Sequence, residues 1–326
     1  MASDRHNPCL FLLPKSATPS NAHGGELGLE CTQIDLITHT KTQITFFLNP
    51  SRGVNELFVD GHACVSHGAL VLIVGGYSAS GSGGIHILNT ATRQWTAGPK
   101  MLFPRGSFAW GVIGNRLYMA GGIGPSGNIQ ETEAYDFETG ELWAVAALPV
   151  SMAVDVFFVF SNKLCVRGWV RERGGRSAES KSRCLRYCPD RNAWHNDPWM
   201  QKVVKRVPRM TRFKFAVTSD EELYRAELKT DNLSWKKPWT VFVHKLDREN
   251  FEWKQFFNII DSEVPNHCEC PAAEREVRFF ACRDKLVALM HHDDPDEGEV
   301  TPLIDKITEV SFLCPFKWAS AAILYA

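Results

Sequence analysis

Side chains that could bind a metal ion lie close together in the C-terminal third of the sequence. His267, Cys268 and Cys270 form one group, and His291 and His292 follow 21 residues after Cys270. Thiolate and imidazole groups bind zinc, but structural zinc sites usually separate paired ligands by two to four intervening residues. Neither group has that spacing. We therefore expect loop residues rather than a metal site, and no cofactor.

Cations dominate two short segments of the chain. Arg171, Arg173 and Arg176 lie in one, and the other runs from Lys202 to Arg212. We expect both to be loops between strands, where partners commonly dock. Arginine and tryptophan often dominate the energetics of an interface, so we assign a partner-binding role to the three arginines and to Trp235 of a later loop. An acidic or phosphorylated peptide would fit these charges; the alternative is that the loops are only solvated.

A glycine-rich segment, residues 75–84, has the composition of a phosphate-binding loop. Such loops lead from a strand into the N-terminus of a helix. Here the segment leads into Ile85-His86-Ile87-Leu88, which reads as a strand, so we expect a hairpin loop. Cys184 and Cys188 fall on a strand and at its end, where their side chains are poorly oriented to bind one metal ion together.

The overall composition restricts the classes of partner. The chain has 326 residues, 36 Lys and Arg against 37 Asp and Glu, and a formal net charge of -1. No global field therefore favours nucleic acid or an anionic membrane. The N-terminal apolar run is short, and ten cysteines are scattered without a dense framework, which is typical of a reducing compartment. We expect a cytoplasmic or nuclear protein that acts as a monomer.

The elements that must position these residues repeat along the chain. The clearest copy reads Phe108 to Ile113, Gly114-Asn115, Arg116 to Ala120, and then Gly121-Gly122. Two apolar runs joined by Gly-Asn predict a β-hairpin, because both residues tolerate the positive φ of a tight turn. The preceding copy ends in the same way, with Leu70 to Val74 before Gly75-Gly76.

Four tryptophans close successive copies at intervals of 48, 51 and 59 residues: Trp95, Trp143, Trp194 and Trp253. A period of about 50 residues is typical of one propeller blade of four strands. We assign these tryptophans and the two glycine pairs to the fold rather than to a site.

In this pattern the chain resembles the kelch-repeat family, and in particular the plant F-box/kelch proteins. The resemblance implies an all-β, six-bladed β-propeller similar to the central domain of galactose oxidase. Residues 1–6 would be a short tail and residues 7–326 one domain. The C-terminal run Trp318 to Tyr325 resembles an innermost strand, so we expect it to complete the first blade and close the ring.

The same resemblance implies a protein-interaction module, such as a substrate-recognition component linked to ubiquitin ligases. No helical F-box precedes the first expected strand, so we expect that this chain does not recruit a ligase by itself. No catalytic triad or carboxylate pair can be assigned from spacing, and we expect no enzymatic activity. The alternative is a metal-dependent, galactose-oxidase-like enzyme on the same propeller.

Overall fold

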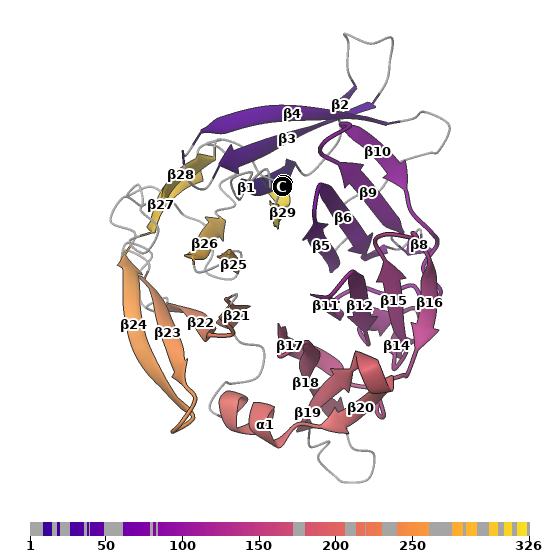
Figure 1. Cartoon of the computed structure of the whole chain (residues 1–326), viewed down its shortest axis with the longest axis vertical. Helices are drawn as coiled ribbons and strands as arrows, with labels where there is room; N and C mark the ends of the chain where they lie inside the picture. Colours follow the sequence, from indigo (N-terminus) through magenta and orange to yellow (C-terminus); the bar gives the residue numbers. More distant parts are fainter. Residues whose placement is uncertain are drawn as a thin grey trace, which may run out of the picture. The chain divides into compact units, whose positions relative to one another are not determined.

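The protein is described by a computed structural model, and its elements are almost entirely β-strands, as the sequence predicts (Figure 1). The structure describes residues 9–14, 18–19, 27–35, 38, 40–48, 61–78, 81–82, 84–171, 180–205, 213–218, 220–229, 240–260, 276–282, 285–291, 300–305, 310–314 and 318–324. Within these ranges one α-helix, α1 (Pro198–Val204), and one short 3-10 helix, η1 (Pro189–Arg191), accompany the strands.

Three four-stranded antiparallel sheets follow one another along the chain, each with its strands in sequence order (Figure 1). Sheet 3 contains β11 (Ala109–Ile113), β12 (Arg116–Ala120), β15 (Thr132–Asp136) and β16 (Leu142–Val145). Sheet 4 contains β17 (Ala153–Phe160), β18 (Lys163–Arg171), β19 (Ser180–Cys188) and β20 (Ala193–Asn196). Sheet 5 contains β21 (Phe213–Val217), β22 (Leu223–Lys229), β23 (Thr240–Asp247) and β24 (Glu252–Ile260).

The N-terminal strands form two further groups of four. Sheet 1 contains β1 (Cys9–Pro14), β3 (Leu27–Asp35), β4 (Lys41–Leu48) and β29 (Trp318–Leu324), and the short β2 (Thr18–Pro19) pairs with β3. Sheet 2 contains β5 (His62–His67), β6 (Leu70–Gly75), β9 (Ile85–Asn89) and β10 (Gln94–Ala97). Their outer strands, β4 and β10, pair in parallel over two residues, which joins the two groups into one hydrogen-bonded path.

The glycine-rich segment forms a hairpin that leads into a strand, as expected. It contains β7 (Tyr77–Ser78) and β8 (Gly81–Ser82), and the equivalent loop of sheet 3 contains β13 (Ile123–Gly124) and β14 (Gly127–Asn128).

The C-terminal strands pair only two by two in the described residues. They are β25 (Glu276–Cys282) with β26 (Lys285–His291), and β27 (Val300–Asp305) with β28 (Val310–Cys314). Sheets 1 to 4 form a propeller-like arrangement, whereas the number of six blades stays a prediction.

Contact density divides the chain into two compact units. Unit 1 is Met1–Pro198 with Trp318–Ala326, and unit 2 is Trp199–Lys317. Sheets 1 to 4 belong to the first unit and sheet 5 to the second. The single domain expected over residues 7–326 stays a prediction. None of the helices in the described ranges has the length and apolarity needed to span a bilayer.

One prediction of a loop is wrong in part. The basic segment from Lys202 to Arg212 is predicted to be a loop between two strands, but its first residues, from Lys202 to Val204, belong to the helix α1. Met200, Val203 and Val204 of this helix are buried, and their spacing of three and four residues places them on one helical face. Burial of that apolar face explains the helix. Residues 206–212 lie outside the described ranges.

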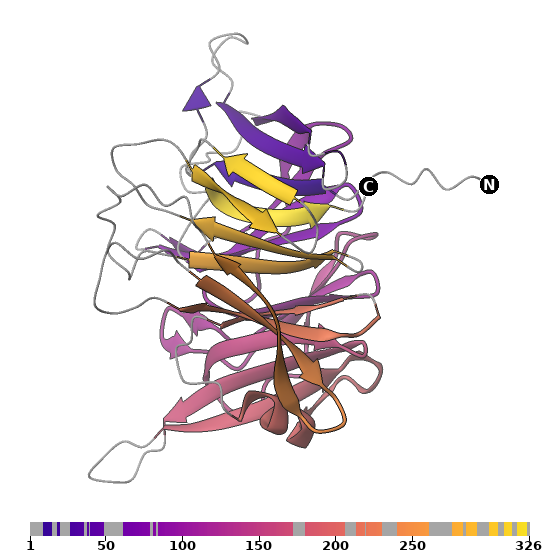
Figure 2. The same ribbon diagram turned by 90° about the vertical axis from the view of Figure 1, so that its left-hand side faces the viewer.

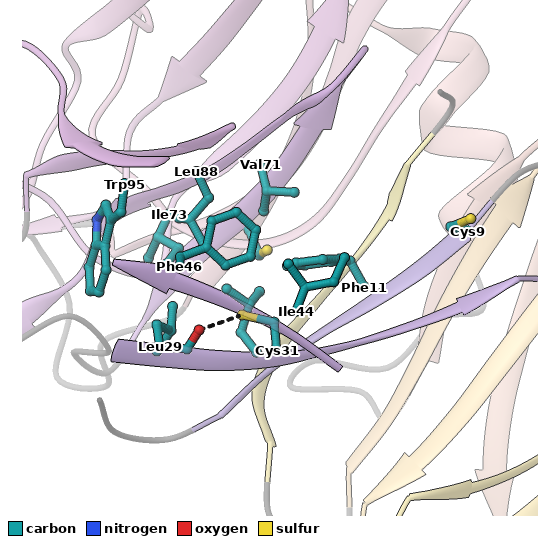
Figure 3. Close-up of a cluster of buried hydrophobic side chains, with 12 residues drawn as sticks. Cys9, Phe11, Leu29, Cys31, Ile44, Phe46, Val71, Ile73, Leu88 and Trp95 are labelled. Carbon is teal, nitrogen blue, oxygen red and sulfur yellow. Dashed lines mark hydrogen bonds between the residues drawn. The ribbon is translucent and has the colours of Figure 1, made fainter. Parts of the chain in front are cut away.

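The inner strands of sheets 2 and 3 bury both of their faces between consecutive sheets. On β12, Leu117 and Met119 pack with sheet 2, whereas Tyr118 and Ala120 pack with sheet 4. This follows from the two-residue period of a strand, which sends successive side chains to opposite faces. Figure 3 shows the equivalent layer between sheets 1 and 2, where Phe46 lies among side chains of both sheets. Full burial of each such side chain contributes about 1.5–3 kcal/mol.

The repeated glycines have nearly the same backbone conformation in the two copies. The φ angles are 69° and 96° at Gly75 and Gly76, and 61° and 97° at Gly121 and Gly122. A Cβ atom on Gly75 would lie 2.7 Å from the carbonyl oxygen of Arg105. Both the angle and the close approach therefore favour glycine.

The four marker tryptophans lie on the outermost strands β10, β16, β20 and β24. Nε1 of Trp194 donates to the carbonyl oxygen of Ala146 at 2.8 Å, and Nε1 of Trp253 donates to that of Val203 at 2.9 Å. The partners are 48 and 50 residues apart in sequence. Each bond thus ties an outer strand to the segment that follows the preceding outer strand.

The C-terminal strand β29 pairs antiparallel with β1, from Cys9 opposite Leu324 to Pro14 opposite Trp318 (Figure 2). This pairing places the two ends of the chain in one sheet, at the position where the sequence analysis expects the last strand. Closure of a ring by this strand stays a prediction.

We predict that deleting residues 317–326 lowers the free energy of unfolding by about 3 kcal/mol or more, because β1 loses its ladder hydrogen bonds and becomes an exposed edge. Urea unfolding measures this loss. Deleting only residues 325–326, which follow β29, is the matched control and should leave stability unchanged. Equal stability of both deletions would contradict the prediction.

Candidate functional site

The hairpin of β18 and β19 is longer than its counterpart in sheet 3. The pair β12 and β15 has five facing residue pairs, whereas β18 and β19 have eight. The last three are Trp169 with Ser182, Val170 with Lys181, and Arg171 with Ser180. We name residues 169–171 and 180–183 the basic arm. The expected loop from Val170 to Lys181 is thus partly a continuation of two strands.

A change at the glycine pair explains the extra length. Leu117 faces Tyr135 and Leu164 faces Tyr187, so these pairs are equivalent in the two sheets. Counting from them, Gly168 occupies the position of Gly121, and tryptophan replaces the second glycine. Neither Gly168 nor Trp169 has a positive φ, and the chain stays in the strand. Without the left-handed turn, pairing continues outward.

The basic arm carries exposed positive charge. Lys181 and Arg183 are exposed, while Trp169 and Val170 are half-buried. Residues 169–183 contain five cations and two acids: Arg171, Arg173, Arg176, Lys181 and Arg183 against Glu172 and Glu179. The segment is therefore a local source of positive potential on a chain whose net charge is -1.

Only the backbone of one predicted contact residue falls within the described residues. Arg171 ends β18 and pairs with Ser180. Arg173, Arg176 and Trp235 lie outside the described ranges, so their proposed contact role stays a prediction. The described part instead adds Lys181 and Arg183, two exposed cations of the same basic segment.

A largely enclosed carboxylate, 12% exposed, holds the base of the basic arm. Asp155 accepts hydrogen bonds from Nε and Nη2 of Arg167, at 3.0 and 2.7 Å, and from Nε1 of Trp169 at 2.7 Å. The Arg167 side chain is 3% exposed. The strand register shifts between Val154 and Val156, and a bulge of this kind redirects the side chain within it. Asp155 thus fixes two consecutive inward residues of β18 where the arm begins.

Further buried polar groups lie on the same strands. Nη2 of Arg186 is 2.9 Å from Oδ1 of Asp197, which is fully buried. Burial raises the pKa of the Cys184 thiol to about 12, although neighbouring Arg167 favours the thiolate. Burial also raises the pKa of Cys165. Both thiols are neutral at physiological pH and pack as small apolar groups rather than as nucleophiles.

A second buried ion pair organises the entry into sheet 3. Nη2 of Arg105 is 2.8 Å from Oε2 of Glu133, and both side chains are fully buried. The other nitrogens of Arg105 donate to the carbonyl oxygens of Phe103, Gly121 and Glu131. Burial lowers the pKa of Arg105, while Glu133 opposes that shift. All these bonds hold residues 102–105 against the loop after β12.

Neither the Asp155–Arg167 pair nor the Arg105–Glu133 pair was predicted from the sequence. Asp155 interrupts an otherwise apolar run, Ala144 to Phe160, and an acid in a core strand signals a buried cationic partner. The partner itself depends on strand register, which the sequence does not display.

The histidines and cysteines considered for a metal site lie almost entirely outside the described ranges, so the expectation of loop residues there stays a prediction. His267, Cys268, Cys270 and His292 lie outside the described ranges, and only the backbone of His291 is described, on β26. Among the residues whose side chains are described, no group of three or more His, Cys, Asp or Glu could hold a metal ion.

The comparisons with known proteins agree with the repeated sheets. The kelch motif model matches residues 60–102, which contain the four strands of sheet 2. Over 103 residues the chain is 30% identical to Kelch-like protein 34 from Homo sapiens, and this match covers 27% of the chain and 16% of that protein. The match thus spans a small part of the relative. These similarities support a kelch-repeat protein.

We predict that Asp155→Asn destabilises the protein by about 3 kcal/mol, because it removes the carboxylate charge that pairs with the buried Arg167 guanidinium. Urea unfolding followed by tryptophan fluorescence measures the change. Lys254→Gln is the control, since it breaks an ion pair whose lysine is 68% exposed, and it should match the wild type. A wild-type midpoint for Asp155→Asn would show that the carboxylate does not hold the arm.

Proposed function

We propose that the chain is a non-enzymatic, kelch-type protein-interaction module that binds an acidic or phosphorylated segment of a partner protein through the basic arm. The observation that carries this proposal is that the basic arm exposes Lys181 and Arg183 and begins at the ion pair of Asp155 with Arg167. The Asp155 anchor limits the conformations of the arm's base before binding, and such preorganisation reduces the entropy lost in the complex.

The charge of the arm favours an anionic partner. Lys181 and Arg183 are exposed on neighbouring positions of β19, and the flanking sequence adds three arginines. Clustered arginines recognise carboxylates and phosphates with paired hydrogen bonds. Complementary charge also accelerates the encounter and is screened by salt. Kelch propellers generally bind proteins, and this agrees with a peptide rather than a small molecule as the ligand.

A role in the choice of substrates for ubiquitin ligases is the cellular function that fits this proposal. The resemblance to plant F-box/kelch proteins supports a role in choosing substrates for ubiquitin ligases, and a cytoplasmic or nuclear monomer suits that role. Mass spectrometry of proteins that co-purify with the chain would test it, because a ligase adaptor among them is the expected finding if a separate F-box protein takes part.

We predict that Lys181→Glu with Arg183→Glu weakens partner binding by at least about tenfold, and that higher salt weakens the wild type similarly. Partners captured from cell extract by the wild type are purified, and their Kd is measured by surface plasmon resonance. The reason for the loss is charge repulsion at the contact surface.

Arg93→Glu with Arg191→Glu is the matched control. Both residues are exposed, and they lie in the turns after β9 and β19, at the opposite strand ends from the arm. This variant changes net charge equally and should retain binding. Undiminished affinity of a folded Lys181→Glu, Arg183→Glu variant would refute the role of the arm.

A further inference from the structure

Exposed hydrophobic side chains gather on the loops of sheet 3. Among the described residues, three large hydrophobic side chains are strongly exposed: Leu102, Ile123 and Phe256, at 52%, 46% and 51%. Two of them, Leu102 and Ile123, come from segments that lie side by side. Gly106 and Ile123 exchange two backbone hydrogen bonds, at 2.9 and 2.8 Å. The carbonyl oxygen of Pro104 also lies 3.3 Å from the place where a Cβ atom of Gly124 would be.

The support beneath these two side chains is rigid. The backbone N–H of Leu102 donates to Oε1 of Glu133 at 2.6 Å, and the same carboxylate pairs with the buried Arg105. Arg105 in turn donates to the carbonyl oxygen of Gly121. Leu102 and Ile123 are therefore exposed on a buried, hydrogen-bonded frame, which is the setting in which an apolar side chain can anchor a partner.

Short steps connect this pair to the basic arm within unit 1. Ile123 pairs with Asn128 across the β13–β14 hairpin, and the Ser151 hydroxyl donates to the carbonyl oxygen of Asn128 at 2.6 Å. Two residues later, Ala153 pairs with Trp169 at the base of the arm. The whole path is at most about 25 Å, which an extended peptide of roughly eight residues spans.

We propose that Leu102 and Ile123 form an apolar anchor site beside the basic arm, and that the ligand is an extended acidic segment carrying one large aliphatic or aromatic side chain. The inference rests on the proposed function of the arm and adds the second half of the recognition site. The acidic part lies along Lys181 and Arg183, and the apolar side chain packs on Leu102 and Ile123.

Charge and size select this occupant over two others. Two exposed side chains offer far less apolar surface than a stable dimer buries. A vesicle surface would meet the basic arm too, but the path of at most about 25 Å between the two groups matches the length of a short extended peptide. Membrane binding is therefore one outcome that the test must distinguish.

The test uses the whole chain and a random peptide phage library. Peptides that bind should contain acidic residues and one large apolar residue within about eight positions. The Kd of a selected peptide is then measured by fluorescence anisotropy for the wild type and three variants: Leu102→Ser with Ile123→Ser, Lys181→Glu with Arg183→Glu, and Phe256→Ser. The last is the matched control, because Phe256 is equally exposed but lies in unit 2.

Leu102→Ser with Ile123→Ser should weaken binding by about tenfold or more, while Phe256→Ser changes it less than about twofold. Replacing the apolar residue of the peptide by alanine should weaken wild-type binding by the same factor and should not weaken the Leu102→Ser, Ile123→Ser variant further, because coupled residues are not additive. Unchanged thermal unfolding of each variant shows that the fold is intact.

The outcomes separate this inference from the proposed function. Wild-type affinity of the Leu102→Ser, Ile123→Ser variant, together with loss in the Lys181→Glu, Arg183→Glu variant, refutes the anchor and leaves the arm. A library that yields no acidic binder refutes both. Binding to phosphatidylserine vesicles that Leu102→Ser with Ile123→Ser abolishes, without peptide binding, also refutes the peptide ligand.

Discussion

Burial of both faces of sheets 2 and 3 between their neighbours is the constraint on which the first unit depends. Strands such as β6 and β12 have apolar side chains at residues 71–74 and 117–120, and alternate residues pack with the preceding and the following sheet. A single sheet of this kind would leave one apolar face in water. Repetition is therefore required for stability, as in other repeat architectures. The tryptophan bonds at 48 and 50 residues add a polar tie between consecutive repeats.

Polar groups buried within these layers decide where the loops lie. Arg105 with Glu133 holds the entry into sheet 3, and Asp155 with Arg167 and Trp169 holds the base of the long hairpin in sheet 4. A buried ion pair contributes little net stability, but loss of one partner is costly, so such pairs specify geometry. Both pairs lie directly beneath the surfaces that we propose for binding. In this proposal the ion pairs that stabilise the fold also position the residues that contact the partner.

The repeat, the strands and the hairpin turns could be predicted from the sequence because each depends on local patterns. Gly114-Asn115 and the two glycine pairs give the turn positions directly, and β11, β12 and β15 lie where the pattern places them. The replacement of the second glycine by Trp169 can be read from the sequence too. Its consequence, a hairpin with three more pairs, depends on how β18 meets β19, which is a tertiary property.

The candidate site was harder to predict for the same reason. Asp155 contacts Arg167 and Trp169 because the register of β17 shifts at that position. The backbone N–H of Leu102 donates to the carboxylate of Glu133, which is 31 residues away in sequence. Neither of these two contacts can be recognised from the residues next to it in the sequence. The helix α1 was not predicted. Its only local signal is the spacing of Met200, Val203 and Val204, and the charge of Lys202 favoured a solvated loop instead.

Hydrogen–deuterium exchange of the whole chain, with and without a peptide selected from the phage library, tests the central claim most directly. The account predicts slower exchange on binding in the basic arm and in residues 102–128, with unit 2 unchanged. Protection confined to unit 2, or to the turns after β9 and β19, would contradict it.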